Sequence, residues 1–282
     1  MTTHEWLEAL ATVASVHRVQ AAQRTVVWRR WGRGSPLVLL HGGHGNWMHW
    51  ARNVIALSAH HEVWVPDLPG YGASDLPPEA SLEAMAQAIR STLATLVPEP
   101  EPMALLGFSF GGLVAAQLAS MRPAVTQLAL LGPAGHGGTR RPKGELRPWR
   151  PALKAQDQAA LREVMRHNLL IHMIHAPDAV DELALTIHTR ACAETRFRSK
   201  PLSRATGLPN LLAPYTGRLL VAWGEHDVTA DPPSVMSQLN APQAICTQHT
   251  VAGAGHWVQF EAADSINRLL NDWLAPPTKK ET

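Results

Sequence analysis

Short apolar runs, each bounded by glycine, proline or polar residues, recur along the chain. Continuous apolar runs of this length are typical of parallel strands that are buried on both faces of a sheet. The runs that predict such strands are residues 37–40, 63–65, 103–106, 128–131, 219–222 and 244–251. Ahead of them, polar and apolar residues alternate in 16–20 and 25–31, and a glycine- and proline-containing turn follows at 32–36. This alternation predicts a β-hairpin.

Helical patterns lie between several of the predicted strands, at residues 81–96, 112–121 and 262–273. Strands that alternate with helices predict an α/β fold, here a doubly wound, mostly parallel sheet of eight strands. One long segment differs, because it is rich in Pro, Arg, His and Met and follows a helical pattern. The predicted units are the first part of an α/β core at 1–132, an inserted helical cap at 133–213 and the second part of the core at 214–282. We expect the tail 276–282 to be disordered.

The composition is that of an ordinary globular enzyme, with 45% hydrophobic and 17% charged residues among 282. The formal net charge of +2, with basic residues scattered except around 140–150, does not indicate a nucleic-acid-binding surface. The N-terminal segment lacks the basic and apolar regions of a signal peptide, and no apolar run approaches the roughly 20 residues that cross a membrane. Cys192 and Cys246 are far apart and lack metal-type spacing, which favours a reducing compartment. We expect a cytoplasmic protein without nucleic-acid or membrane partners.

The strongest chemical signal is a G-x-S-x-G pattern centred on Ser109. An apolar strand precedes it and a helical pattern begins near Gly112, which is the arrangement of a nucleophile elbow. Gly107 and Gly111, two positions before and after the serine, avoid clashes in the sharp turn that exposes the hydroxyl. Ser109 is therefore the predicted nucleophile.

A serine hydroxyl needs a general base and a carboxylate that orients the base. His256 lies in a glycine-rich loop after the last predicted strand, and it is the predicted base. Asp227 follows the strand at 219–222 and is the predicted acid, since sites in such sheets form at the carboxyl ends of strands. Glu225, two residues earlier, is the alternative acid. The order Ser, Asp, His along the chain is the one that this elbow motif predicts.

Backbone N–H groups must also stabilise the oxyanion that forms when the serine attacks. The strand 37–40 ends in His-Gly-Gly-His-Gly, where glycine lets the main chain approach the substrate oxygen. We expect the oxyanion hole to consist of the N–H of Gly43 and the N–H of Phe110, the residue after the nucleophile.

These segments together resemble the α/β-hydrolase superfamily over nearly all of the chain outside the predicted cap. The resemblance is carried by residues 40–43, 66–74, 107–112, 224–227 and 255–257. It implies a serine hydrolase that acts on a small molecule, and we expect neither a cofactor nor a metal. Haloalkane dehalogenases and many epoxide hydrolases carry Asp at the nucleophile position, so Ser109 disfavours those chemistries.

The pattern at 256–261 is similar to that of C–C hydrolases that cleave ring-fission products of aromatic compounds. The chain departs from them at Phe108, where they usually carry Asn, and at His44, which replaces a glycine. The main prediction is a carboxylesterase-like enzyme that cleaves a small carboxylic ester through an acyl-enzyme on Ser109. The alternative is a C–C bond hydrolase of a vinylogous keto acid. A non-catalytic ligand-binding protein and a cofactor-free oxygenase or perhydrolase are further alternatives.

Five residues are candidates for contacting the substrate: His41, Gly42, Phe108, Arg190 and Trp257. Arg190 lies near the end of the predicted cap, and its guanidinium group is suited to bidentate pairing with a substrate carboxylate. If this part of the cap faces solvent, a neutral ester is favoured. The oligomeric state is left open, and a homodimer is compatible with the sequence.

The cap also contains a pair of histidines, His172 and His175, at an i, i+3 spacing that can bind a metal. No acidic or cysteine ligand accompanies them. We therefore expect these histidines to pack within the cap or to line the substrate pocket.

Overall fold

The computed structural model describes residues 1–239 and 241–276, and its centre is one sheet. Within these residues the sheet has eight strands in the order β1-β2-β4-β3-β5-β6-β7-β8. The strands are β1 Ser15–Ala21, β2 Arg24–Trp31, β3 Ser35–Leu40, β4 His61–Pro66, β5 Met103–Phe108, β6 Val125–Leu131, β7 Arg218–Gly224 and β8 Ile245–Val251. β2 runs antiparallel to β1 and β4, and all other neighbouring pairs are parallel. The predicted hairpin and the doubly wound, mostly parallel sheet are confirmed.

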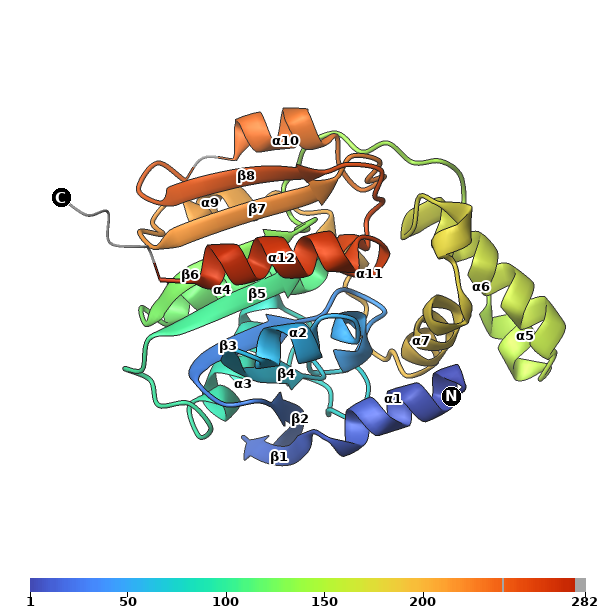
Figure 1. Ribbon diagram of the computed structural model, residues 1–282, viewed down its shortest axis with the longest axis horizontal. Helices are drawn as coiled ribbons and strands as arrows, with labels where there is room; N and C mark the ends of the chain where they lie inside the picture. The colour runs from blue at the N-terminus through green and yellow to red at the C-terminus, as the bar shows by residue number, and fades with distance from the viewer. Residues whose placement is uncertain (240, 277–282) are drawn as a thin grey trace.

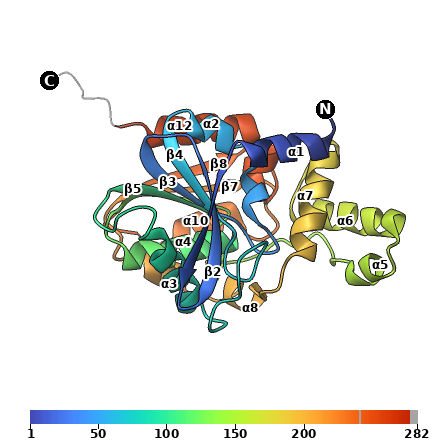
Figure 2. The ribbon, with the colours of Figure 1, turned by 90° about the horizontal axis from the view of Figure 1, so that it is seen from below.

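Helices cover both faces of this sheet. Those of the core are α1 Thr3–Thr12, η1 Trp47–Trp50, α2 Val54–Ser58, α3 Leu82–Leu93, α4 Phe110–Met121, α10 Pro232–Gln238, α11 Val258–Glu261 and α12 Ala263–Leu274. α2 and α12 lie on one face of the sheet, and α3 and α4 lie on the other (Figures 1 and 2). α4 begins directly after Ser109, two residues earlier than predicted. Among the described residues, no helix combines the length and apolar character needed to cross a bilayer.

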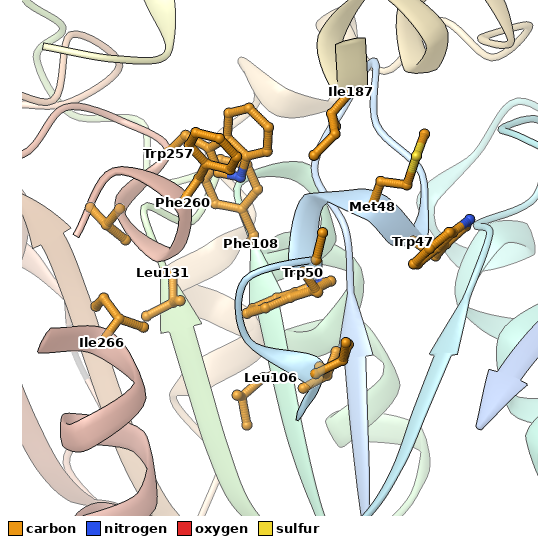
Figure 3. Close-up of a cluster of buried hydrophobic side chains, with 14 of the residues drawn as sticks. Trp47, Met48, Trp50, Leu106, Phe108, Leu131, Ile187, Trp257, Phe260 and Ile266 are labelled. Atoms are coloured by element: carbon orange, nitrogen blue, oxygen red, sulfur yellow. The ribbon is translucent and has the colours of Figure 1, made fainter. Parts of the chain in front are cut away.

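Alternate side chains of the strands enter two separate hydrophobic clusters. Leu37 and Leu39 of β3 belong to the cluster on one face, and Val38 and Leu40 belong to the cluster on the other. Each of these four side chains is fully buried. Figure 3 shows the first cluster, in which Phe108, Trp257 and Phe260 gather near the end of β5. Burial on both faces explains why the strands appear as continuous apolar runs.

The last strand contradicts this rule. We predicted that 244–251 is a buried apolar strand, but β8 is exposed along its length except at Val251, and Ile245 is 72% exposed. In the part of the chain that the structure describes, β8 is the edge of the sheet and pairs only with β7. An edge strand without a covering layer keeps polar side chains in contact with water, which explains the mixed sequence of β8.

The chain between β6 and β7 contributes α5 Arg150–Lys154, α6 Gln158–His172, η2 Pro177–Ala179, α7 Glu182–Ala193, α8 Lys200–Ser203 and α9 Leu208–Leu212. α6 and α7 lie beyond the carboxyl ends of the parallel strands, while α8 and α9 pack against α4 (Figures 1 and 2). Ile187 of α7 points toward the core cluster that contains Met48 (Figure 3). Of the predicted disordered tail 276–282, residues 277–282 lie outside the described residues.

Candidate active site

Ser109 occupies the turn between β5 and α4, at the carboxyl end of a central strand. Its φ of 54° and ψ of −117° form a backbone conformation that residues other than glycine rarely adopt. The flanking glycines make room for the turn. A Cβ atom on Gly107 would lie 2.4 Å from the carbonyl oxygen of Gly111, and one on Gly111 would lie 2.3 Å from that of His41. The serine side chain is left partly exposed.

Three side chains from separate segments form one chain of hydrogen bonds at this turn. The Oγ of Ser109 is 2.9 Å from Nε2 of His256, and Nδ1 of His256 is 2.7 Å from Oδ2 of Asp227. His256 and Asp227 are buried, at 3% and 0% exposure. The structure thus brings the predicted nucleophile, base and acid within hydrogen-bond distance of one another.

Asp227 is held by Thr229, a residue that the sequence analysis did not identify. The backbone N–H and the hydroxyl of Thr229 donate to Oδ1 of Asp227 at 2.7 and 2.8 Å. Burial on its own raises the pKa of Asp227, but the charge and hydrogen bond of His256 and the hydrogen bonds from Thr229 outweigh it and lower the pKa. The carboxylate is therefore kept ionised beside the imidazole.

The alternative acid, Glu225, lies elsewhere. Its side chain is 53% exposed, and its carboxylate accepts a hydrogen bond from the backbone N–H of Gly253 at 2.9 Å. The end of β7, just before the two acids, is in close main-chain contact with the loop that carries His256. A Cβ atom on Gly224 would lie 2.0 Å from the carbonyl oxygen of Gly255, so glycine at this position lets the loop approach β7.

Gly43 and Phe110, the predicted oxyanion donors, lie next to each other beside Ser109. A Cβ atom on Gly43 would lie 3.8 Å from Cβ of Phe110 and 2.6 Å from Oγ of Ser199. Phe110 is the first residue of α4, so its N–H has no acceptor within the helix. Within the described residues, the N–H of Gly43 donates to no backbone carbonyl. Among the described residues, neither N–H group is thus donated to a backbone carbonyl, which is compatible with the predicted oxyanion hole.

The structure places four of the candidate substrate-binding residues in the packing behind Ser109. His41 is fully buried, with Nδ1 2.8 Å from the carbonyl oxygen of Gly42 and Nε2 accepting the N–H of Leu68 at 2.9 Å. Trp257 stacks on a phenylalanine ring and donates to the carbonyl oxygen of His49, and it has no exposed surface. Phe108 is equally buried, and a Cβ atom on Gly42 would lie 2.9 Å from its ring. The ring nitrogens of His41 and Trp257 thus already form hydrogen bonds within the protein.

Arg190, the fifth candidate, is not brought to Ser109. Its side chain is 54% exposed and forms an ion pair with Glu194 at 3.0 Å. Arg196, Arg198 and Arg204 are also exposed. Because a flexible, charged side chain is best solvated at the surface, the exposed face of the helical segment holds these arginines.

A basic side chain with different surroundings is Arg140, which the sequence analysis placed only in a basic cluster. It is partly buried and donates to the carbonyl oxygen of Ser203 at 3.0 Å. Burial and the charge of Arg204 lower the pKa of Arg140, while the charge of Asp227 raises it. Within the described residues, Arg140 forms no ion pair with an acidic side chain.

Histidines from the helical segment also converge on the site. The His172 ring, at the end of α6, lies 5.8 Å from the His256 ring between centroids. His188 of α7 is buried beside Cys192, and burial lowers its pKa to about 4. No periodicity in the sequence could reveal this convergence, because it depends on how α6 and α7 pack over the core. Among residues 1–239 and 241–276, no three His, Cys, Asp or Glu side chains gather as metal ligands.

The chain is similar to several known proteins. The model of the alpha/beta hydrolase family matches residues 37–269. The 2-hydroxy-6-oxo-6-phenylhexa-2,4-dienoate hydrolase of Burkholderia cepacia is 29% identical over 86% of this chain and 89% of its own. A pimeloyl-[acyl-carrier protein] methyl ester esterase of Aeromonas hydrophila is 44% identical, over 33% of this chain and 35% of its own. The structure of a meta-cleavage product hydrolase from Pseudomonas fluorescens IP01 superposes with a TM-score of 0.71 at 22% identity, covering 92% of this chain and 97% of that one. The chain therefore belongs to the alpha/beta hydrolase family.

Proposed function

We propose that this hydrolase acts through Ser109 as nucleophile, His256 as general base and Asp227 as the carboxylate that orients the base. The observation that carries the proposal is the continuous hydrogen-bond chain from Ser109 Oγ through His256 to Asp227, on a strained turn at the end of β5. An exposed hydroxyl beside a buried imidazole and carboxylate is the arrangement that activates serine.

In the proposed reaction His256 takes the Ser109 proton while Oγ attacks the substrate carbonyl carbon. The carbonyl oxygen becomes an oxyanion, which the N–H groups of Gly43 and Phe110 stabilise. His256 then gives the proton to the leaving group as its bond to the carbonyl carbon breaks. Water, activated by the same imidazole, hydrolyses the resulting acyl-enzyme.

We propose a vinylogous keto acid as the substrate and the C–C bond next to its ketone as the bond that is cleaved. The dienoate hydrolase of Burkholderia cepacia is similar over most of both chains, whereas the methyl ester esterase matches only about a third. A dienoate carries a carboxylate, and the partly buried Arg140 supplies a cation without an acidic partner among the described residues. The segment 133–213 would serve as the cap that positions this acid.

Hydrolysis of a small neutral ester is the second candidate. It is favoured by the solvent-facing positions of Arg190, Arg196 and Arg198, which leave fewer cations for a substrate carboxylate. Phe108 and His44, the departures from the C–C hydrolase pattern, favour it as well.

The deciding experiment compares kcat/KM for 2-hydroxy-6-oxo-6-phenylhexa-2,4-dienoate and for p-nitrophenyl butyrate. We expect the dienoate to be preferred by at least about tenfold, roughly 1.4 kcal/mol. Arg140→Ala should remove most of this preference, because a charge-assisted pair with the carboxylate is lost. Arg190→Ala is the matched control and should leave it unchanged. If the native protein and both variants prefer the ester, the function is hydrolysis of a small neutral ester.

A further inference from the structure

His172 is a polar side chain at the site that the proposed mechanism does not use. It is the last residue of α6, and its ring is tilted by 55° against the ring of His256 at a centroid distance of 5.8 Å. His256 in turn contacts Ser109 at 2.9 Å. The imidazole of His172 therefore contacts the histidine that is hydrogen-bonded to Ser109, and it comes from the segment between β6 and β7.

The ring nitrogens of His172 are not engaged by the protein. Two buried histidines near the site differ from it: His41 contacts two backbone groups, and Nδ1 of His49 accepts the N–H of Gly42 at 3.3 Å. Within the described residues, His172 makes no hydrogen bond, although it is only partly exposed. A half-buried imidazole that lacks a protein partner is suited to a polar atom of a ligand.

The surroundings of His172 keep it neutral. Burial is the main cause that lowers its pKa to about 3, and the charges of His256, Arg140 and His188 add to it, while Asp227 opposes them. A neutral imidazole can donate to or accept from an uncharged oxygen, but it cannot form an ion pair. The partner that suits His172 is therefore an uncharged polar group.

From its place beside His256 we infer that His172 is a specificity-determining residue that hydrogen-bonds an uncharged oxygen of the substrate, next to the carboxylate that the proposed function assigns to Arg140. The ligand class is a 2-oxo or 2-hydroxy acid, in which one carbon separates the two groups. This inference rests on the proposed function for the orientation of the acid, with its reacting carbonyl at Ser109.

The test measures binding by calorimetry and requires no turnover. The probes are 6-phenyl-2-oxohexanoate and 6-phenylhexanoate, which differ in one oxygen and lack the bond that Ser109 would cleave. We expect the 2-oxo acid to bind about five- to tenfold more tightly, the range of one neutral hydrogen bond. His172→Phe should make the two affinities equal, and His172→Gln, which keeps a donor and an acceptor, should restore part of the difference.

The matched control is His167→Phe, on the same helix, where the imidazole lies 3.0 Å from the carbonyl oxygen of Glu145 at the surface. It should leave the difference unchanged. Equal binding of the two acids by the native protein, no binding of either, or a difference that survives in His172→Phe would each overturn the inference.

Labelling of Ser109 by a fluorophosphonate tests the proposed function separately. Labelling without discrimination between the acids would refute the role of His172 alone. Discrimination without labelling would refute the nucleophile alone.

Discussion

At Ser109 the backbone is held in a conformation that costs on the order of 1–3 kcal/mol for a residue with a side chain. The surrounding packing imposes this cost, since the backbone around Gly107 and Gly111 leaves no room even for a Cβ atom at either position. Such strain is typical of functional residues, because it presents a side chain that a relaxed turn would fold back. The hydroxyl itself contributes one hydrogen bond, to His256.

Replacing Ser109 by Ala should therefore abolish activity and leave stability nearly unchanged. Alanine adopts the strained turn as readily as serine, so the thermal midpoint should stay close to that of the native protein. We expect kcat to fall by about 10⁴–10⁶. Ser120→Ala, at the exposed end of α4, serves as the control and should keep full activity. A Ser109→Ala protein with a tenth of native activity would refute the assignment.

Asp227 and Glu225 offer a second comparison between similar residues in different environments. Asp227→Asn removes the charge that orients His256, and we expect kcat/KM to fall by about 10³–10⁴. Glu225→Gln changes an exposed side chain and should alter kcat/KM by less than about threefold. Steady-state kinetics of the two variants measures both values. A reversed order would make Glu225 the acid.

Between elements, Glu261 joins the histidine loop to the chain after α6. Its carboxylate at the end of α11 accepts the backbone N–H groups of His175, Ala176 and Gly255, the shortest at 2.7 Å. A Cβ atom on Gly255 would lie 2.7 Å from the nitrogen of His175, so the two segments touch. One carboxylate thus fixes the loop of His256 against the helical segment that carries His172.

Glu261→Gln should loosen this junction. An amide oxygen is a weaker acceptor than a carboxylate, so we expect a loss of about 1–3 kcal/mol in the free energy of unfolding. Urea denaturation measures the loss, and kcat/KM should fall with it because His256 is less well positioned. Glu163→Gln on α6 removes a surface ion pair with Arg147 and should be nearly neutral. Equal effects in the two variants would show that Glu261 does not join the segments.

Across the fold, buried neutral histidines make stability sensitive to acid. Burial lowers the pKa of His41 to about 4 and that of His188 to about 4, from an ordinary value of 6.5. In the unfolded chain both imidazoles take up a proton below pH 6.5, while in the folded protein they remain neutral down to about pH 4. The unfolded state then binds more protons, so stability falls as the pH falls.

We expect the free energy of unfolding to be greatest above pH 6.5 and to decrease steadily toward pH 4. Each of the two lowered pKa values corresponds to a loss of roughly 3 kcal/mol in the free energy of unfolding when the pH reaches about 4. Urea denaturation at several pH values measures this decrease. His188→Gln removes one of the groups and should flatten the profile in the same range. An unchanged slope in that variant would show that His188 does not contribute.

Local patterns were sufficient to predict the eight strands, the nucleophile turn at Ser109 and the segments that carry Asp227 and His256. They were sufficient because a buried strand must be apolar and a strained turn requires glycine, and both constraints act over a few neighbouring residues. Other features depended on contacts between distant segments. The exposure of β8 follows from its place at the sheet edge, and the burial of Trp257 follows from its packing on the core. The outward position of Arg190 and the inward position of His172 follow from how α6 and α7 lie over the strands, because rotating a helix about its axis changes which side chains face the site without changing the sequence pattern.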